Sequence, residues 1–124
     1  MTLEVAIFLS MNGKAKEAID FYIRTFNAKT LMVVTYGDLA QRDPDFKMTE
    51  ENNDLIAHSV LQIGKTKVMI AEDTMNPDEN YQVGNNFSLC IQSADLEEIQ
   101  TFYKNITSDD RVKIIAPLGK TIFS

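Results

Sequence analysis

Apolar and polar positions follow one another along the first half of the chain in blocks that predict strands and a helix. Residues 3–10 are apolar and β-compatible, and the turn formers at 11–13 end this first predicted strand. Over 15–26, apolar side chains recur every three or four residues with charged ones between them, which predicts an amphipathic helix that ends near Asn27. The β-branched run over 28–36 predicts a strand that is buried on much of both faces.

A polar stretch and a glycine-containing turn organise the residues that follow. Residues 37–54 are polar, contain a proline and show no period, so we expect a long loop over or beside a site. Residues 55–63 and 67–71 flank a turn at 64–66 and predict a β-hairpin. Residues 72–86 are polar and predict a linker.

The expected register of this hairpin brings polar side chains to one face. A turn through 64–66 places three pairs of residues opposite each other on that face: His58 with Glu72, Val60 with Ile70, and Gln62 with Val68. A one-residue change in turn length would send them to opposite faces, because side chains alternate along a strand.

The second half of the chain repeats the first at a shift of 81 positions. Residues 8–22 then lie on 89–103 without a gap, and the strand at 28–36 lies on 109–117. The shift predicts a strand near 89–91, a helix that begins after Asp95, and a strand at 111–116. Asp95 and the acidic residue three positions later form the Asp-x-x-Glu version of a capping box.

This second module lacks a counterpart of the hairpin within the 124 residues of the sequence. Two explanations stay open at this point. Either the sequence is a fragment, or a partner chain completes an open sheet, because an uncovered strand edge invites pairing. The second explanation predicts a homodimer.

Composition narrows the classes of function. With 12 basic against 18 acidic residues the net charge is −6, and no basic run occurs, so nucleic acid and anionic membranes are not expected partners. The single cysteine, Cys90, excludes an internal disulfide and a cysteine-based zinc cluster. No basic leader occurs, and no apolar run approaches the roughly 18 residues that a membrane span needs. We expect a soluble, cytoplasmic protein.

Several local motifs, together with the order of elements, carry a resemblance to a known family. The motifs lie at 12–22 (Asn-Gly-Lys-Ala-Lys-Glu-Ala-Ile-Asp-Phe-Tyr), 26–28, 58–64, 68–73, 85–89 and 116–118. The chain resembles the vicinal oxygen chelate superfamily, which includes glyoxalase I, bleomycin-resistance proteins and extradiol dioxygenases, and more closely its PhnB-like branch. The family's closing segment, rich in Trp, Gly and Phe, is absent, and the chain contains no Trp.

The resemblance implies an α+β fold of tandem βαβββ modules whose sheets curve around a shared cavity. The single domain would span 1–124, with module one at 1–78 and an incomplete module two at 85–124. Members of this branch are often labelled as 3-demethylubiquinone methyltransferase-like. The sequence gives methyl transfer no support, because a Rossmann-type methyltransferase needs a glycine-rich strand-to-helix turn and the five glycines form no such cluster.

The resemblance also implies a divalent metal held by His, Gln or Glu side chains on four strands, which then chelates vicinal oxygens of a substrate. His58 and Glu72 are the candidate ligands, and Glu72 resembles the ligand that ends a strand in many members of the superfamily. Imidazole and carboxylate together suit Zn, Ni or Fe(II), and Mn is a further candidate.

Other residues weaken the metal hypothesis. The expected first-strand ligand positions hold Ile7 and Leu9, and their counterparts in the repeat are Ser88 and Cys90. His58 is the only histidine. A hydrogen bond from His58 to Glu72 or to a backbone group explains both residues without a metal, so no cofactor is assured.

We therefore favour a dimeric protein that binds a small molecule, and whether it is an enzyme stays open. The residues expected to line its cavity are Phe8, His58, Val60, Gln62, Ile70, Glu72 and Ser88. One alternative is a metal-dependent lyase or dioxygenase with His58 and Glu72 as ligands. Another is a bleomycin-type resistance protein that sequesters a cationic drug in an acidic cleft between subunits.

Overall fold

The computed structural model describes residues 2–42, 53–72 and 80–119. The chain divides into two units, 1–84 and 85–124, and each is described by itself. No helix in the described ranges is long and apolar enough to cross a membrane.

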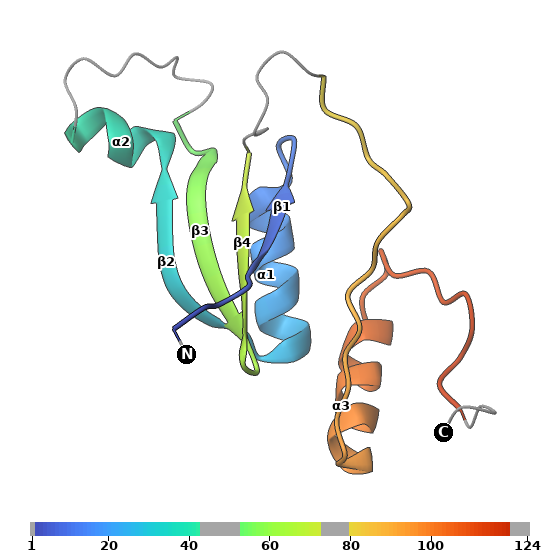
Figure 1. Cartoon of the computed structure of the whole chain (residues 1–124). Helices are drawn as coiled ribbons and strands as arrows, with labels where there is room; N and C mark the ends of the chain where they lie inside the picture. Colours follow the sequence, from blue (N-terminus) through green and yellow to red (C-terminus); the bar gives the residue numbers. More distant parts are fainter. Residues whose placement is uncertain (1, 43–52, 73–79, 120–124) are drawn as a thin grey trace. The chain divides into compact units, whose positions relative to one another are not determined.

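The first unit contains a four-stranded sheet and two helices (Figure 1). In chain order these elements are β1 (Ile7–Ser10), α1 (Ala15–Phe26), β2 (Lys29–Thr35), α2 (Tyr36–Arg42), β3 (Ile56–Ile63) and β4 (Thr66–Ala71). The strands lie in the order β1-β4-β3-β2, with β1 parallel to β4 and the other pairs antiparallel. The predicted βαβββ order is confirmed, with α2 added to it, and the β3–β4 hairpin lies between β1 and β2.

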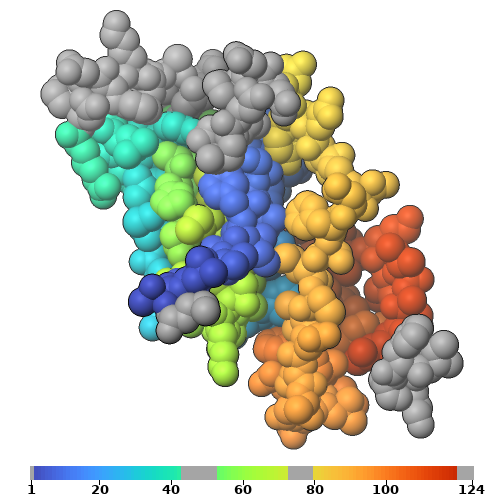
Figure 2. Space-filling model, in the orientation of Figure 1, coloured from blue at the N-terminus to red at the C-terminus, as the bar shows by residue number. Residues whose placement is uncertain are grey.

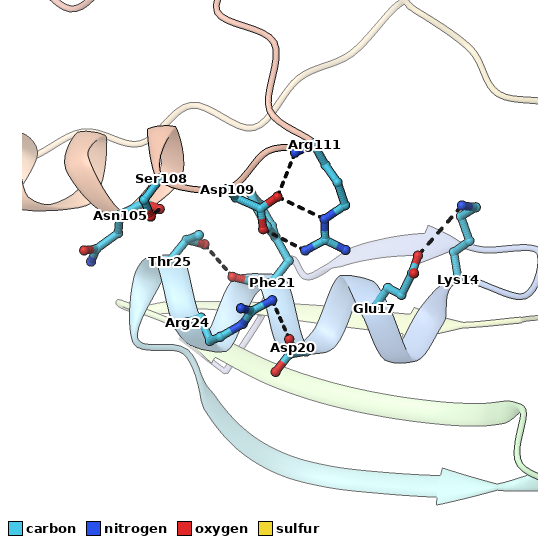
Figure 3. Close-up of polar contacts among 10 residues, drawn as sticks. All are labelled: Lys14, Glu17, Asp20, Phe21, Arg24, Thr25, Asn105, Ser108, Asp109 and Arg111. Carbon is cyan, nitrogen blue, oxygen red and sulfur yellow. Dashed lines mark hydrogen bonds and ion pairs between the residues drawn. The ribbon is translucent and has the colours of Figure 1, made fainter.

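Helix α1 covers one face of the sheet, packing against β3 and β4. The core lies between them and consists of buried apolar residues: Leu9, Ala15, Ile19, Ala28, Ile56, Leu61, Val68 and Ile70. The outer side of α1 carries the exposed ion pairs Lys14–Glu17 and Asp20–Arg24 (Figure 3), and such exposed pairs contribute little to stability. The helix ends as predicted at Asn27, which adopts the left-handed conformation with a φ of 55°.

The expectation that the second strand is buried on both faces is wrong. β2 lies at the edge of the sheet, beside β3 and outside the two strands against which α1 packs. Leu31, Met32 and Val33 are 40–43% exposed, and only Val34 of this strand is fully buried. A β-branched run therefore indicates a strand here without indicating its place in the sheet.

The expected long loop at 37–54 is wrong in its first part, because α2 occupies 36–42. Thr35 and Asp38 form a reciprocal cap: the Asp38 N–H donates to Thr35 Oγ1 over 3.1 Å, and the Thr35 N–H donates to Asp38 Oδ2 over 3.0 Å. Hydrogen bonding of the Asp38 carboxylate by the Thr35 backbone N–H, and next by the Thr35 side chain, holds the pKa of Asp38 below its usual value. Residues 43–52 lie outside the described part of the chain.

The hairpin register differs by one residue from the expected one. Ile63 pairs with Thr66, so the turn contains only Gly64 and Lys65. Gly64 has a φ of 57° at the first central position, which fits the glycine requirement of a type II′ turn. The shorter turn places Val60 opposite Met69.

The second unit contains one helix, α3 (Leu96–Thr107), in its described residues 85–119. Its bounds equal those of α1 displaced by 81 positions, so the predicted second helix is confirmed. The Asp95 side chain accepts hydrogen bonds from the N–H groups of Glu97 (3.0 Å) and Glu98 (3.3 Å). The Asp95 N–H donates to Ser93 Oγ, so the box does not close through Glu98.

The strands predicted near 89–91 and at 111–116 are wrong, because the structure assigns no strand within 85–119. A strand requires a neighbour that takes its backbone hydrogen bonds. The described residues of the second unit provide no paired neighbour for either segment. The shift of 81 positions and the local apolar pattern therefore predicted more sheet than residues 85–119 form.

Candidate functional site

The face of the first-unit sheet opposite α1 carries most of the candidate residues, and we call it the open face. Directly opposite residues on paired strands point to the same side of a sheet. Four apolar side chains therefore form one row across all four strands, the apolar row: Phe8, Met69, Val60 and Met32. Phe8 and Met32 are 37% and 40% exposed, and Val60 and Met69 are half-buried.

A polar row lies next to the apolar row, toward the hairpin turn. Gln62 has Lys67 opposite it on β4 and Lys29 opposite it on β2, and we call these three residues the cationic row. Gln62 Nε2 donates to the Gly64 carbonyl oxygen over 3.1 Å. Lys67 Nζ lies 3.1 Å from Glu4 Oε2, in a pair that is largely exposed.

His58 lies on the other side of the apolar row. It is half-buried and opposite Val34, and it shares the open face with Val60 because it lies two residues away on the same strand. Ser10 occupies the corresponding region of β1, opposite Ala71. The structure thus brings four of the predicted residues to one face: Phe8, His58, Val60 and Gln62. Figure 2 shows atoms of the strands at the surface of the first unit, in cyan to yellow-green.

Glu72 lies on the opposite side of the sheet from His58 and holds backbone groups. Its Oε1 accepts the Ala15 N–H over 3.0 Å and its Oε2 accepts the Ile56 N–H over 2.7 Å. Helix α1 has no side-chain cap of its own at Lys14, so Glu72 caps the helix from a distant strand end. Its carbonyl oxygen also accepts the Tyr36 hydroxyl over 3.3 Å. Glu72 therefore joins the beginnings of α1, β3 and α2.

The residues present do not fit the metal centre that the resemblance implies. The register places His58 on the open face, whereas the Glu72 carboxylate accepts the Ala15 N–H at the start of α1, which covers the other face, and the Ile56 N–H at the start of β3. Ile7 and Leu9, the expected first-strand positions, belong to the packing under α1. Within the described ranges, no three His, Cys, Asp or Glu side chains lie close enough together to hold a metal ion.

Two further predicted residues do not join the open face. Ile70 has 0% exposure and belongs to the core under α1. Ser88 lies in the second unit, in a segment without regular structure. Sequence reasoning placed Met69 and Met32 in strands but favoured a core role over a place in the cavity, and it did not single out the two lysines of the cationic row. A two-residue turn at Gly64-Lys65 was the signal for Met69 and Lys67, because it places them opposite Val60 and Gln62.

The chain matches known proteins over most of its length. The model of the family described as 3-demethylubiquinone-9 3-methyltransferase matches residues 3–116. Among curated proteins, the chain is similar to protein YjdN of Escherichia coli strain K12, with 23% identity over 115 residues. That match covers 86% of this chain and 74% of YjdN.

Solved structures show the same fold. A PhnB protein from Bacillus cereus matches with a TM-score of 0.68 and 23% identity, over 98% of this chain and 85% of that one. Protein PA1353 from Pseudomonas aeruginosa matches with a TM-score of 0.67 and 19% identity, over 86% of this chain and 73% of that one. TioX from Micromonospora sp. ML1 matches with a TM-score of 0.53 and 17% identity, over 98% and 80% of the two chains. At these low identities, the TM-scores support a common mixed α+β fold and nothing beyond the fold.

Proposed function

The chain belongs to the family described as 3-demethylubiquinone-9 3-methyltransferase, in its PhnB-like form, and on this premise we propose that it binds a small molecule on the open face. The apolar row is the observation that carries this proposal. Ligand sites are mostly apolar surfaces with a few polar groups that orient the ligand. Here an edge-to-edge apolar row lies between His58 on one side and the cationic row on the other.

Methyl transfer is not part of the proposed function. In Rossmann-type enzymes, free N–H groups at the start of the first helix face the cofactor. In this chain the Glu72 carboxylate already accepts the Ala15 N–H at the start of α1. Three antiparallel strands of the four-stranded sheet also differ from the parallel sheet of a Rossmann fold.

The other two candidate functions find less support. A metal-dependent lyase or dioxygenase would need His58 and Glu72 on one face, and the register separates them. Sequestration of a cationic drug would need a surplus of acidic groups beside the apolar row. Lys29 and Lys67 lie there instead, and the carboxylate of Glu4 is paired with Lys67. A neutral or anionic ligand suits this face better.

We also infer that the chain is a tandem-module member of the vicinal oxygen chelate superfamily and forms a homodimer. The matching bounds of α1 and α3 support the tandem arrangement. No residue of α3 is fully buried, and Leu96 is 68% exposed, which supports a partner surface. Sedimentation at micromolar concentration tests the dimer, and a stable, folded monomer would contradict it.

Binding on the open face is tested by a matched pair of substitutions on β2. Met32 and Val33 are adjacent and equally exposed, but Met32 lies opposite Val60 on the open face and Val33 lies opposite Ser59 on the other. The probe is phenylnaphthylamine, a neutral aromatic molecule that fluoresces in apolar sites. We expect Met32→Glu to weaken its binding about tenfold and Val33→Glu to change it less than about twofold. No binding to the wild type, or equal losses in the two variants, would overturn the proposal.

A further inference from the structure

The cationic row gives the open face a local charge opposite to that of the whole chain. The net charge of the protein is −6, yet Lys29 and Lys67 both stand opposite Gln62, one on each side of it. They come from strands on either side of β3, so the sheet register, and not chain proximity, brings them together. Positive groups gathered beside an apolar surface favour an anion attached to an apolar body.

The polar groups of this row can exchange their present contacts for a ligand. The Lys67–Glu4 pair has side chains that are 43% and 71% exposed, and exposed pairs of this kind are weak. Lys29 is exposed. The Gln62 side-chain amide donates once, to the Gly64 carbonyl oxygen, and an amide NH2 carries a second donor. The row therefore offers two ammonium groups and one N–H.

The spacing of the rows sets the shape of a matching ligand. Gln62 and Val60 are two residues apart on β3, so their side chains are separated by about 7 Å along the strand. We propose that the ligand of the open face is an anionic amphiphile, with a carboxylate-like or sulfonate-like head at the cationic row and an apolar body along the apolar row. This inference rests on the proposed small-molecule function and adds the charge of the ligand.

Two probes that differ by one charged group test it. Anilinonaphthalene sulfonate has the aromatic body of phenylnaphthylamine with an added sulfonate. We expect wild-type protein to bind the sulfonate probe more tightly than the neutral one at low salt. The double variant Lys29→Gln, Lys67→Gln should weaken the sulfonate probe about fivefold and leave the neutral probe within about twofold.

Matched variants control for net charge. The double variant Lys14→Gln, Lys16→Gln removes the same two charges from exposed positions at the start of α1, and it should leave both affinities unchanged. Glu4→Gln removes the partner of Lys67 and should strengthen binding of the sulfonate probe about twofold. Raising salt from about 20 mM to about 300 mM should weaken only the sulfonate probe, because exposed charges are screened.

The two proposals fail in different ways. If both probes bind equally and the lysine variants change neither affinity, the anionic class is wrong and binding on the open face stands. If the Lys14→Gln, Lys16→Gln variant weakens the sulfonate probe as much as the Lys29→Gln, Lys67→Gln variant does, the effect is general charge attraction and the cationic row is wrong as the head-group site. If neither probe binds wild-type protein, both proposals are wrong.

Discussion

The two faces of the first-unit sheet are built from the same strands, yet they differ in what their side chains do. On the face covered by α1, Leu61 and Ile70 are fully buried, and the Glu72 carboxylate holds two backbone N–H groups. On the open face, Phe8 and Met32 remain more than a third exposed. The covered face therefore contributes most of the free energy of folding, and the open face has side chains that are accessible to a ligand.

The largest expected effect comes from truncating a side chain on the covered face. Leu61→Ala should lower the free energy of unfolding by about 3 kcal/mol, because it removes a fully buried side chain and leaves a cavity. The neighbouring Val60→Ala, on the open face, should cost about 1 kcal/mol or less. Urea unfolding followed by circular dichroism measures both. Equal losses would show that the open face is packed as tightly as the covered one.

Glu72 and His58 provide the next test, because the sheet separates these two predicted ligands. Glu72→Ala leaves the N–H groups of Ala15 and Ile56 without their acceptor and should cost about 2 kcal/mol of stability. Glu72→Gln keeps one acceptor oxygen, so its stability should fall between that of Glu72→Ala and that of the wild type. His58 is half-buried on the open face, and His58→Ala should cost about 0.5 kcal/mol of stability.

The same variants test the metal hypothesis directly. We expect titration with Zn²⁺ or Ni²⁺ to show no stoichiometric site that both Glu72→Ala and His58→Ala remove. A site lost in both variants would mean that the two side chains share an ion, and it would contradict their placement on opposite faces. A urea midpoint that shifts in Glu72→Ala but not with added metal would agree with a capping role.

How far the sequence predicts this molecule depends on whether a feature is local. The helix over 15–26, its end at Asn27 and the equivalent helix at 96–107 follow from nearby residues and were predicted. The missed helix α2 also had a local signal, the Thr-x-x-Asp cap at 35–38. The burial of β2 and the strands expected in the second unit depend on distant neighbours, which a local pattern does not contain.

The candidate site was predicted in part for the same reason. Phe8, His58, Val60 and Gln62 share a face because residues alternate along a strand. Glu72 and Ile70 were expected with them because the turn was taken as three residues long. A glycine with positive φ at Gly64 allows a two-residue turn, and that difference of one residue moves every side chain of β4 to the other face.

The turn that sets the two faces is itself testable. Gly64→Ala should cost about 1 kcal/mol, because a φ of 57° is strained for a residue with a Cβ, although nothing lies within 4 Å of that Cβ. The adjacent Lys65→Ala should be neutral, since Lys65 is exposed and is not among the described residues with positive φ. Urea unfolding measures both. A neutral Gly64→Ala would mean that the turn does not hold the register.

The smallest expected effect lies outside both faces, at the start of α2. The hydrogen bonds with Thr35 lower the pKa of Asp38 in the folded protein relative to its unfolded value. The charged carboxylate therefore adds stability above the unfolded pKa, and this contribution is lost as pH falls through the folded pKa. Asp38→Asn should flatten the acid side of the stability curve, measured by urea unfolding between about pH 3 and pH 7. Because the carboxyl group of Asp38 is open to solvent, the change should be smaller than that of Glu72→Ala at neutral pH. A loss of stability in Asp38→Asn as large as that in Glu72→Ala would show that the cap of α2 stabilises the fold as much as the contacts of Glu72 do. The difference between the two faces of the sheet would then not explain where the stability of this unit comes from.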